Sequence, residues 1–302
     1  MMHGLNNMFL YTAKKIISRI TNGNIIQESR GTGFFVKKGD KIVFVTNRHM
    51  IEPGYGDKKL KGYKTFEFLI ESYQSFDEKG LPSKLNSGIV HNINDFVVAD
   101  NPLNDVACLA DVKIRDFQLT ISAYIEYDLL ADKSWFENKL SVCDTIAYPG
   151  FPEWFDVKNN TPIFRMGTIA SDPRFDYANN ALERNMLGAA RVAYEGFSSG
   201  GSSGSPVFAI QKGFPTGAGI SAPEDFFREV KVVGINAGHF NTYTVVKSDD
   251  SGEYIKVENV SEEYADGGNG SDKSKSMTVV GHSGISFFYK SSVIKEVIDK
   301  LC

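Results

Sequence analysis

Gly201-Ser202-Ser203-Gly204-Ser205-Pro206, followed by the apolar run Val207-Phe208-Ala209-Ile210, is the stretch that decides the fold of this sequence of 302 residues. It fits the pattern Gly-x-Ser-Gly-x-Pro, in which a glycine-rich turn leads into a strand. Glycine lets the amides of a tight turn converge on one point, where they can hold an oxyanion. The stretch predicts Ser203 as a nucleophile and the N–H groups of Gly201 and Ser203 as an oxyanion hole. A plain Gly/Ser loop joining two strands is the alternative interpretation.

A serine hydroxyl is a weak nucleophile unless a base removes its proton, so this hypothesis requires a histidine. Of the five histidines, His49 lies just after the strand-like run Ile42 to Thr46 and before the turn Pro53-Gly54. Asp105 directly precedes another short apolar run and is the candidate to orient the imidazole. Singly, His49 could be a surface histidine and Asp105 a turn residue. Their combination with Ser203 favours a nucleophilic site.

Short apolar and β-branched runs separated by turn residues dominate the chain, which predicts an all-β sandwich or pair of barrels. Helical spacing of apolar residues behind a serine N-cap is clear only in 292–301, and it predicts a C-terminal helix. A weaker helical pattern at 124–140 predicts a linker between two halves. The polar stretch 247–276 predicts a mobile loop.

Composition excludes several function classes. The chain has 33 Lys and Arg against 37 Asp and Glu, a net charge of −4, which offers no footprint for a nucleic acid partner. No signal peptide and no apolar stretch near the roughly 20 residues of a membrane span are visible. Three cysteines are too few for a disulfide framework, so we expect a cytoplasmic protein. No Cys or His pairs stand at zinc-ligand spacing, and we expect neither a metal nor another cofactor.

Four segments carry a resemblance to a known family: Gly31-Thr32-Gly33-Phe34-Phe35, Thr46-Asn47-Arg48-His49, Asp105-Val106-Ala107 and the serine motif at 201–206. They occur in the order and rough spacing of the trypsin-like (chymotrypsin-fold) serine peptidases. The match most resembles the bacterial branch that includes the glutamyl endopeptidases and the HtrA-type enzymes. The order His, Asp, Ser supports it, since other triad folds use other orders.

The resemblance implies two six-stranded antiparallel Greek-key barrels followed by a C-terminal helix. The implied domains are an N-terminal extension at 1–24, a barrel with His49 and Asp105 at 25–125, a linker at 126–140, a barrel with Ser203 at 141–288, and a helix at 289–302.

The resemblance further implies a serine endopeptidase that acts on a peptide or protein substrate through an acyl-enzyme. His49 would take the proton of Ser203, and Asp105 would fix the imidazole tautomer. Two positions depart from the family pattern. Ser202 replaces the aspartate that pairs with a newly cleaved N-terminal amine, which argues against activation by amine insertion. Ala237 stands where the family often places a hydroxyl near the triad aspartate.

The resemblance also indicates substrate-binding residues. The strand edge of Asn236, Ala237, Gly238 and His239 would pair with the substrate backbone. Phe197 would form the base of the primary pocket, and the lack of an acid there disfavours cleavage after Lys or Arg. His239 could favour an acidic side chain, as in the glutamyl enzymes, although their pocket histidine aligns with Asn236.

Two alternatives remain open at this point. A catalytically idle peptidase-fold module could bind an extended peptide or protein partner, and the flexible lead-in 198–202 is consistent with that interpretation. A precursor-processing or self-cleaving peptidase of a virus or phage would have the same motifs.

Overall fold

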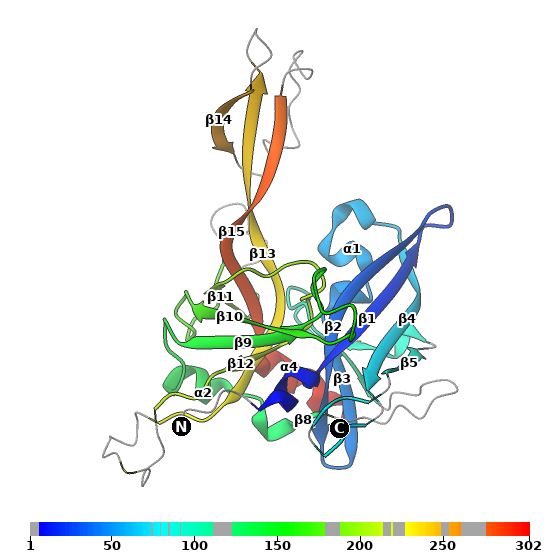
Figure 1. Ribbon diagram of the computed structural model, residues 1–302, viewed down its shortest axis with the longest axis vertical. Helices are drawn as coiled ribbons and strands as arrows, with labels where there is room; N and C mark the ends of the chain where they lie inside the picture. Colours follow the sequence, from blue (N-terminus) through cyan, green and yellow to red (C-terminus); the bar gives the residue numbers. More distant parts are fainter. Residues whose placement is uncertain are drawn as a thin grey trace.

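The structure is a computed structural model that describes residues 6–73, 75–78, 80–83, 85–90, 92–110, 123–178, 188–213, 219, 227–248, 254–260 and 276–302. Two antiparallel sheets make up most of it, and a helix ends the chain (Figure 1). In chain order the elements are η1 (Asn7–Thr12), β1 (Ala13–Thr21), β2 (Ile26–Lys38), β3 (Lys41–Thr46), η2 (Arg48–Met50), α1 (Pro53–Gly56), η3 (Lys58–Leu60), β4 (Lys64–Tyr73), β5 (Leu85–Val90), η4 (Ile93–Asp95), β6 (Val97–Val98), β7 (Ala107–Ala110), β8 (Ile125–Glu126), η5 (Tyr127–Leu129), α2 (Lys133–Asn138), β9 (Thr145–Gly150), β10 (Ile163–Ile169), β11 (Arg191–Glu195), β12 (Pro206–Ala209), β13 (Lys231–Ser248), β14 (Tyr254–Val260), β15 (Ser276–Lys290) and α4 (Ser291–Leu301).

The first sheet has the strand order β5-β4-β1-β2-β3-β7-β6, and β8 pairs with β2. β2 serves two partners in turn: its first part pairs with β1, and its last part, from Phe34 onward, pairs with β3. Buried and less buried residues alternate along β1 from Ile16 onward, as expected for a strand with one face on a core. In the described residues this sheet has two strands more than the predicted six, and its path does not close.

The second sheet closes into a six-stranded barrel. Its order is β12-β9-β10-β11-β15-β13, and β12 also pairs with β13. Closure leaves no unpaired strand edge around the barrel. The predicted all-β fold with a C-terminal helix is therefore confirmed. The division into domains at 25–125 and 141–288 stays a prediction.

β13 and β15 continue together beyond the barrel as an arm, on which β14 forms a third strand (Figure 1). The prediction of a loop throughout 247–276 was thus wrong for β14. Its sequence, Tyr-Ile-Lys-Val-Glu-Asn-Val, is rich in residues that favour strands, and it pairs with β13. The glycine-rich part at 265–272 lies outside the described residues.

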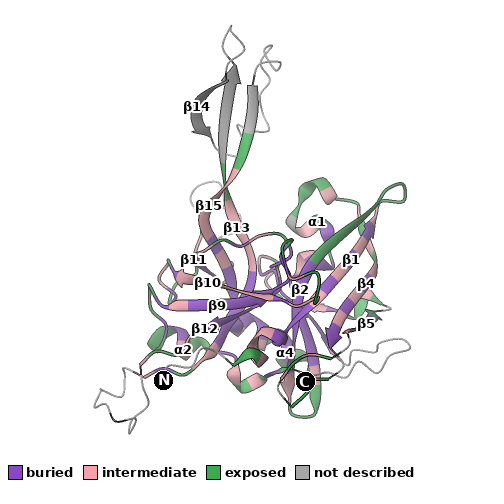
Figure 2. Cartoon of the chain, in the orientation of Figure 1, coloured by how far each residue is buried: buried purple, intermediate pink, exposed green. Residues whose placement is uncertain are grey.

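One core joins the two sheets and the C-terminal helix. Phe34 of the first sheet, Phe208 of the second and one face of α4 belong to the same cluster. Figure 2 shows buried residues along the strands of both sheets. The face of α4 consists of Val293, Ile294, Val297 and Ile298, at the predicted helical spacing. The helix starts at Ser291 with Lys290 as its N-cap, so the predicted serine cap at Ser292 was wrong, and the Ser291 hydroxyl donates to the carbonyl of Ala131 at 2.7 Å.

The stretch predicted as a linker helix, 124–140, is helical only in α2 and in the short η5. Leu130 forms a bridge to Val232, and the N–H of Ala131 donates to the Val232 carbonyl at 2.8 Å. These residues therefore follow β13 instead of continuing a helix. α2 begins only afterwards, where the Asp132 carboxylate accepts from the N–H of Trp135 at 2.8 Å.

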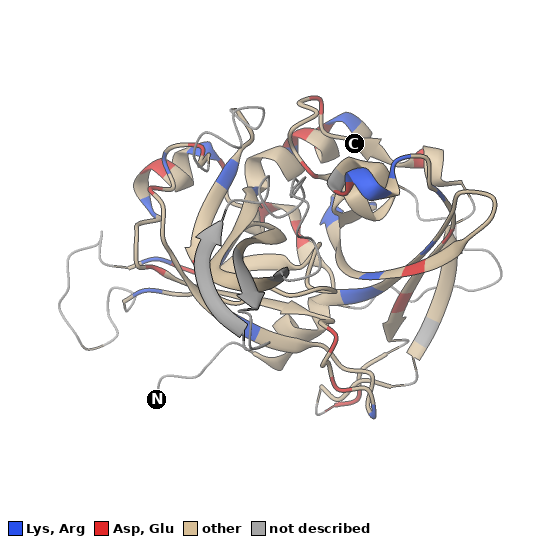
Figure 3. Cartoon of the chain, turned by 90° about the horizontal axis from the view of Figure 1, so that it is seen from above, with Lys and Arg blue, Asp and Glu red and all other residues tan. Residues whose placement is uncertain are grey.

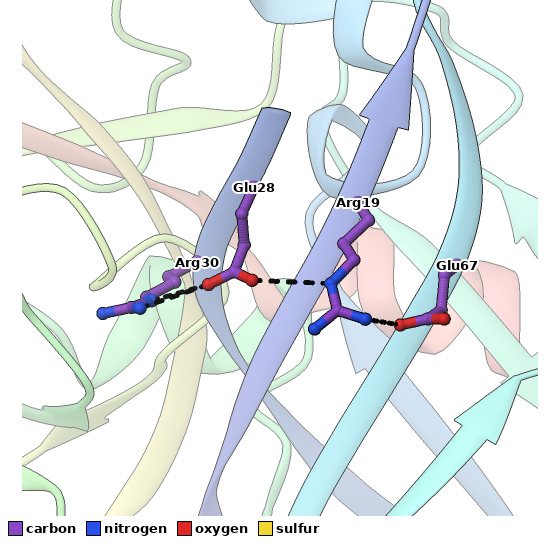
Figure 4. Close-up of polar contacts among 4 residues, drawn as sticks. All are labelled: Arg19, Glu28, Arg30 and Glu67. Carbon is purple, nitrogen blue, oxygen red and sulfur yellow. Dashed lines mark hydrogen bonds and ion pairs between the residues drawn. The ribbon is translucent and has the colours of Figure 1, made fainter. Parts of the chain in front are cut away.

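Charged side chains of both signs are interspersed over the described part of the molecule (Figure 3). On the exposed face of β2, β1 and β4 they form a ladder of alternating sign, Arg30, Glu28, Arg19 and Glu67 (Figure 4). Arg19 stands directly opposite Glu28 in one strand pair and Glu67 in the other. Each charge is thus neutralised by a neighbour in the adjoining strand or on its own strand.

A buried ion pair ties three strands together at one end of the closed barrel. Asp144, just before β9, contacts the guanidinium of Arg228 at 2.5 Å, and both side chains are buried. Arg228 also donates to the carbonyls of Lys139 and Ile210, the latter just after β12. Since Arg228 lies shortly before β13, its contacts hold the starts and ends of neighbouring strands in place.

We predict that Asp144→Ala destabilises the fold by about 3–5 kcal/mol, because it leaves the Arg228 charge buried and unpaired. The double variant Asp144→Ala, Arg228→Met should recover part of this loss, since it removes that charge as well. Urea unfolding of the wild type, both single variants and the double variant measures the coupling. Strictly additive losses would contradict the prediction.

No helix in the described ranges is long and apolar enough to cross a membrane.

Candidate active site

His49 lies in η2, which follows β3. The two oxygens of Asp105 hold it: Oδ1 accepts from the His49 backbone N–H at 2.8 Å, and Oδ2 lies 2.5 Å from Nδ1 of the ring. The side-chain amide of Asn47 donates to the backbone carbonyl of Asp105 at 2.7 Å and so holds Asp105 in place. Because Nδ1 faces the carboxylate, the proton sits there, and Nε2 remains as the basic nitrogen.

Asp105 also sets the pKa of His49. Burial alone would lower the pKa of the imidazole, but the charge of Asp105 and its hydrogen bond to Nδ1 raise it, and the net effect places it above the ordinary 6.5. Only 8 % of the Asp105 side chain is exposed, so solvent screens this pair little.

The loop that carries Ser203 is fastened on two sides. Toward the second sheet, the N–H of Gly204 donates to the carbonyl of Asn236, and the N–H of Asn236 donates to the carbonyl of Ser205, both at 2.8 Å. Toward the first sheet, the carbonyl of Ser203 accepts from the N–H of Thr32 at 2.8 Å. The Ser203 hydroxyl donates to the carbonyl of Ala237 at 3.2 Å in this structure.

Gly201 has the conformation that an oxyanion hole requires. Its φ is +88°, and a Cβ here would lie 2.1 Å from the carbonyl oxygen of Phe151. Only glycine therefore fits. Its carbonyl is turned toward Thr32, whose hydroxyl donates to it at 2.7 Å. Among the described residues, neither the N–H of Gly201 nor that of Ser203 has a hydrogen-bond acceptor, so both amides are available to a ligand.

Thr32 belongs to the first of the four family-like segments, but no role was predicted for it from the sequence. Its backbone N–H holds Ser203, while its hydroxyl donates to Gly201 and accepts from the N–H of Phe151 at 3.1 Å. Its own carbonyl accepts from the hydroxyl of Thr46 at 3.0 Å, and Thr46 ends β3, three residues before His49. A polar β-branched residue between Gly31 and Gly33, directly before the apolar run Phe34-Phe35-Val36, was the available signal.

Asn236 was predicted to contact substrate, and the structure corrects this for its side chain. Asn236 is fully buried: its amide donates to the hydroxyl of Ser198 at 2.9 Å and to the carbonyl of Ser202 at 3.0 Å, and its oxygen accepts from Tyr194 at 2.7 Å. All three polar positions are occupied within the protein. Asn236 therefore stabilises the serine loop through its hydrogen bonds to Ser198 and Ser202.

The other predicted substrate-binding residues lie beside the serine loop. Ala237 and Gly238 follow Asn236 along β13, and the His239 ring stacks on His282 with centroids 4.3 Å apart. Phe197 contacts His282 at 4.9 Å between ring centroids, but it is 60 % exposed and does not form an enclosed pocket floor. Substrate contact by these residues stays a prediction.

His282 was not singled out from the sequence. Its Nε2 lies 3.0 Å from the carbonyl of Ser198, and its Nδ1 accepts from the N–H of Gly284 at 2.8 Å, so the neutral tautomer carries its proton on Nε2. Burial lowers the pKa of both His282 and His239. Two neutral stacked imidazoles therefore stand beside the serine loop near neutral pH.

Two cavities flank the serine loop. One of about 570 Å³ is lined by His49, Asp105 and Ala237, together with apolar side chains that include Leu103 and Phe287. The second, of about 470 Å³, lies against Gly201. Ser29 lines both cavities. In the described part of the chain, no three His, Cys, Asp or Glu side chains gather as a metal site.

No protein-family model and no curated protein sequence matches this chain. Among solved structures it is similar to the thermostable serine protease AL20 from an extremophilic microorganism, with a TM-score of 0.50 at 12 % identity over 97 % of this chain and 98 % of that one. It is also similar to the protease Anisep from Arthrobacter nicotinovorans, with a TM-score of 0.49 at 12 % identity over 96 % and 94 % of the two chains. The first likeness shows that the chain has a serine protease fold.

We predict that His49 titrates above pH 6.5 in the wild type and below 6.5 in Asp105→Asn. The substitution removes the negative charge that raises the pKa and leaves the burial that lowers it. Titration of the imidazole signals by NMR measures both values, and His282, which titrates below 6.5 for other reasons, serves as the internal reference. An unchanged His49 pKa in Asp105→Asn would show that another group sets it.

Proposed function

We propose that this protein is a serine endopeptidase of the trypsin-like (chymotrypsin-fold) type, which hydrolyses peptide bonds through His49, Asp105 and Ser203. The observation that carries the proposal is the double contact of Asp105 with His49, together with a serine whose own amide and that of Gly201 have no acceptor among the described residues. His49 and Ser203 also share a neighbour: Ala237 lines the cavity of His49 and accepts the Ser203 hydroxyl.

The mechanism assigns each group one task. When substrate binds, the Ser203 hydroxyl leaves the Ala237 carbonyl and gives its proton to Nε2 of His49 as Oγ attacks the substrate carbonyl carbon. The N–H groups of Gly201 and Ser203 donate to the oxyanion, and Asp105 stabilises the imidazolium. The imidazolium then protonates the departing amine, which leaves an acyl-enzyme. Water, deprotonated by His49, releases the acyl group and restores Ser203.

The loss of rate expected on removal of one catalytic group is known approximately. Loss of one oxyanion donor or one triad member lowers the rate by about 10² to 10⁴. The positive φ of Gly201 and the hydroxyl of Thr32 matter for this reason, since they aim the first of the two amides.

One observation favours the idle peptide-binding module as a second candidate. The Ser203 hydroxyl is bonded to Ala237, and no hydrogen bond joins it to His49 among the described residues. Catalytic hydrogen bonds are often unformed until substrate binds, so the same geometry also fits an enzyme at rest. The two candidates differ in whether Ser203 can be acylated.

The branch of the family is part of the proposal. Similarity to the glutamyl endopeptidases and HtrA-type enzymes is supported by the stacked His239 and His282 beside the serine loop. The Nε2 proton of His282 is already committed to Ser198, so His239 is the ring that could donate to an acidic substrate side chain. That cleavage does not follow Lys or Arg stays a prediction from the resemblance, which assigns the base of the primary pocket to Phe197.

We predict that a fluorophosphonate probe labels the wild type and Ser205→Ala but not Ser203→Ala. Ser205 is the matched control, since it is two residues away, fully buried and without a hydrogen-bond partner for its hydroxyl in the described structure. Intact-mass measurement of the adduct gives the result. Labelling of Ser203→Ala to the same extent as Ser205→Ala would rule out Ser203, and no labelling of any form would favour the idle module.

We predict that kcat/KM falls in acid with a midpoint above pH 6.5, because protonated His49 cannot accept the Ser203 proton and its pKa is raised by Asp105. The same shift acts on stability with the opposite sign. A raised folded pKa contributes stability below pH 6.5 that is lost as the pH rises through the folded pKa. Peptide hydrolysis between pH 5 and 9 checks the first statement, and a flat profile would contradict it.

A further inference from the structure

The second cavity lies on the side of the serine loop that faces the first sheet. It is lined by Glu28, Ser29 and Arg30 of β2, by Phe151, Pro152, Glu153 and Phe155 after β9, and by Gly200 and Gly201. Gly201 also supplies an amide of the proposed oxyanion hole, so this cavity begins where the reacting carbonyl would sit. Its volume of about 470 Å³ is ample for one long side chain.

The position of the cavity assigns it to one half of a substrate. The serine loop is held by β13 on one side and by Thr32 of β2 on the other. If the acyl half lies along β13, as proposed, the leaving-group half continues over Gly201 toward β2. There β2 offers a free edge, because 26–31 pair only with β1 in the described residues. A peptide can add to that edge as a strand.

Among the charged residues that line the cavity, one carboxylate has no ion-pair partner in the described part of the chain. Arg30 is paired with Glu28 at 3.1 Å, and Glu28 is paired in turn with Arg19, so these charges cancel within the ladder of Figure 4. Glu153 is exposed and makes no ion pair with any described residue. Gly200 lies beside this carboxylate, since a Cβ at Gly200 would be in van der Waals contact with Glu153 Oε1 at 3.5 Å.

The floor of the cavity is aromatic. Phe151 and Phe155 are buried and pack edge to face with ring centroids 5.5 Å apart. Such a surface accommodates the methylene stem of Lys or Arg, and aromatic faces attract cations. Lys15 already lies 5.2 Å from the Phe155 ring centroid, and its charge is balanced by Glu71 at 2.8 Å. An acidic side chain would instead meet the Glu153 carboxylate.

We propose that this cavity is a specificity subsite for a lysine or arginine among the first two residues after the scissile bond, with Glu153 as the residue that selects it. The assignment to that side of the bond rests on the proposed endopeptidase function. The recognition of a basic side chain does not depend on that function. It follows from the cavity, from its aromatic floor and from the Glu153 carboxylate, which makes no ion pair with the described residues.

The first experiment measures cleavage. Paired peptides that differ only in Lys or Leu after the scissile bond, chosen from a peptide library cut by the wild type, give the ratio of kcat/KM. We expect Glu153→Gln to lower the Lys-to-Leu ratio about two- to fivefold, in keeping with an exposed ion pair, and Glu153→Lys to favour Glu at that position. Glu137→Gln, an exposed glutamate on α2, should leave the ratio unchanged. No preference for Lys or Arg in the wild type would overturn the proposal.

The second experiment does not require turnover. Ser203→Ala is immobilised, with and without Glu153→Gln or Glu137→Gln, and retained peptides from a random decapeptide library are sequenced. Enrichment of Lys and Arg that disappears only with Glu153→Gln supports the subsite, even if no peptide is ever cleaved and the proposed function fails. Enrichment that persists in Glu153→Gln, or is absent altogether, overturns it.

Discussion

The hydrogen bonds of Thr32 are the constraint on which the candidate site depends. Two groups of this residue, the backbone N–H and the hydroxyl, make three hydrogen bonds, to the Ser203 carbonyl, the Gly201 carbonyl and the Phe151 N–H, and both groups come from a strand of the other sheet. Since a hydrogen bond between two sheets restrains their relative position, the contacts that hold the carbonyls of Gly201 and Ser203 also align the first sheet, whose strand β3 leads to His49. α4 packs against both sheets, and the apolar surface buried there stabilises the same alignment.

Buried polar groups are expensive unless they are satisfied, and the site meets that condition by dividing its hydrogen bonds between structure and chemistry. Asn236 and Thr32 are occupied within the protein, and Asp105 is occupied by His49 and Asn47. The exceptions in this loop, among the described residues, include the amides of Gly201 and Ser203 and the buried hydroxyls of Ser202 and Ser205. Donors held in place without an acceptor are what charge stabilisation in a transition state requires, because no reorganisation is needed when charge develops.

Much of the architecture could be predicted from periodicity. The apolar repeat of the last helix predicted α4 to within one residue, and the alternating runs predicted an all-β fold. The loop predicted over β14 and the long linker helix were wrong for one reason. In both places the chain pairs with β13, and local pattern carries no information about a partner strand distant in sequence.

The sequence by itself determined which chemical groups are present and in what order: a histidine after a strand, an aspartate before one, and a serine in a glycine-rich turn. It also determined that Gly201 can adopt a positive φ, since that freedom belongs to the residue type. Only the tertiary structure decided that both oxygens of Asp105 hold His49, that the Asn236 side chain is hydrogen-bonded within the protein, and that Glu153 makes no ion pair with the described residues. Those properties depend on distances between segments far apart along the chain, and such distances are set by the packing of two sheets, not by any local preference.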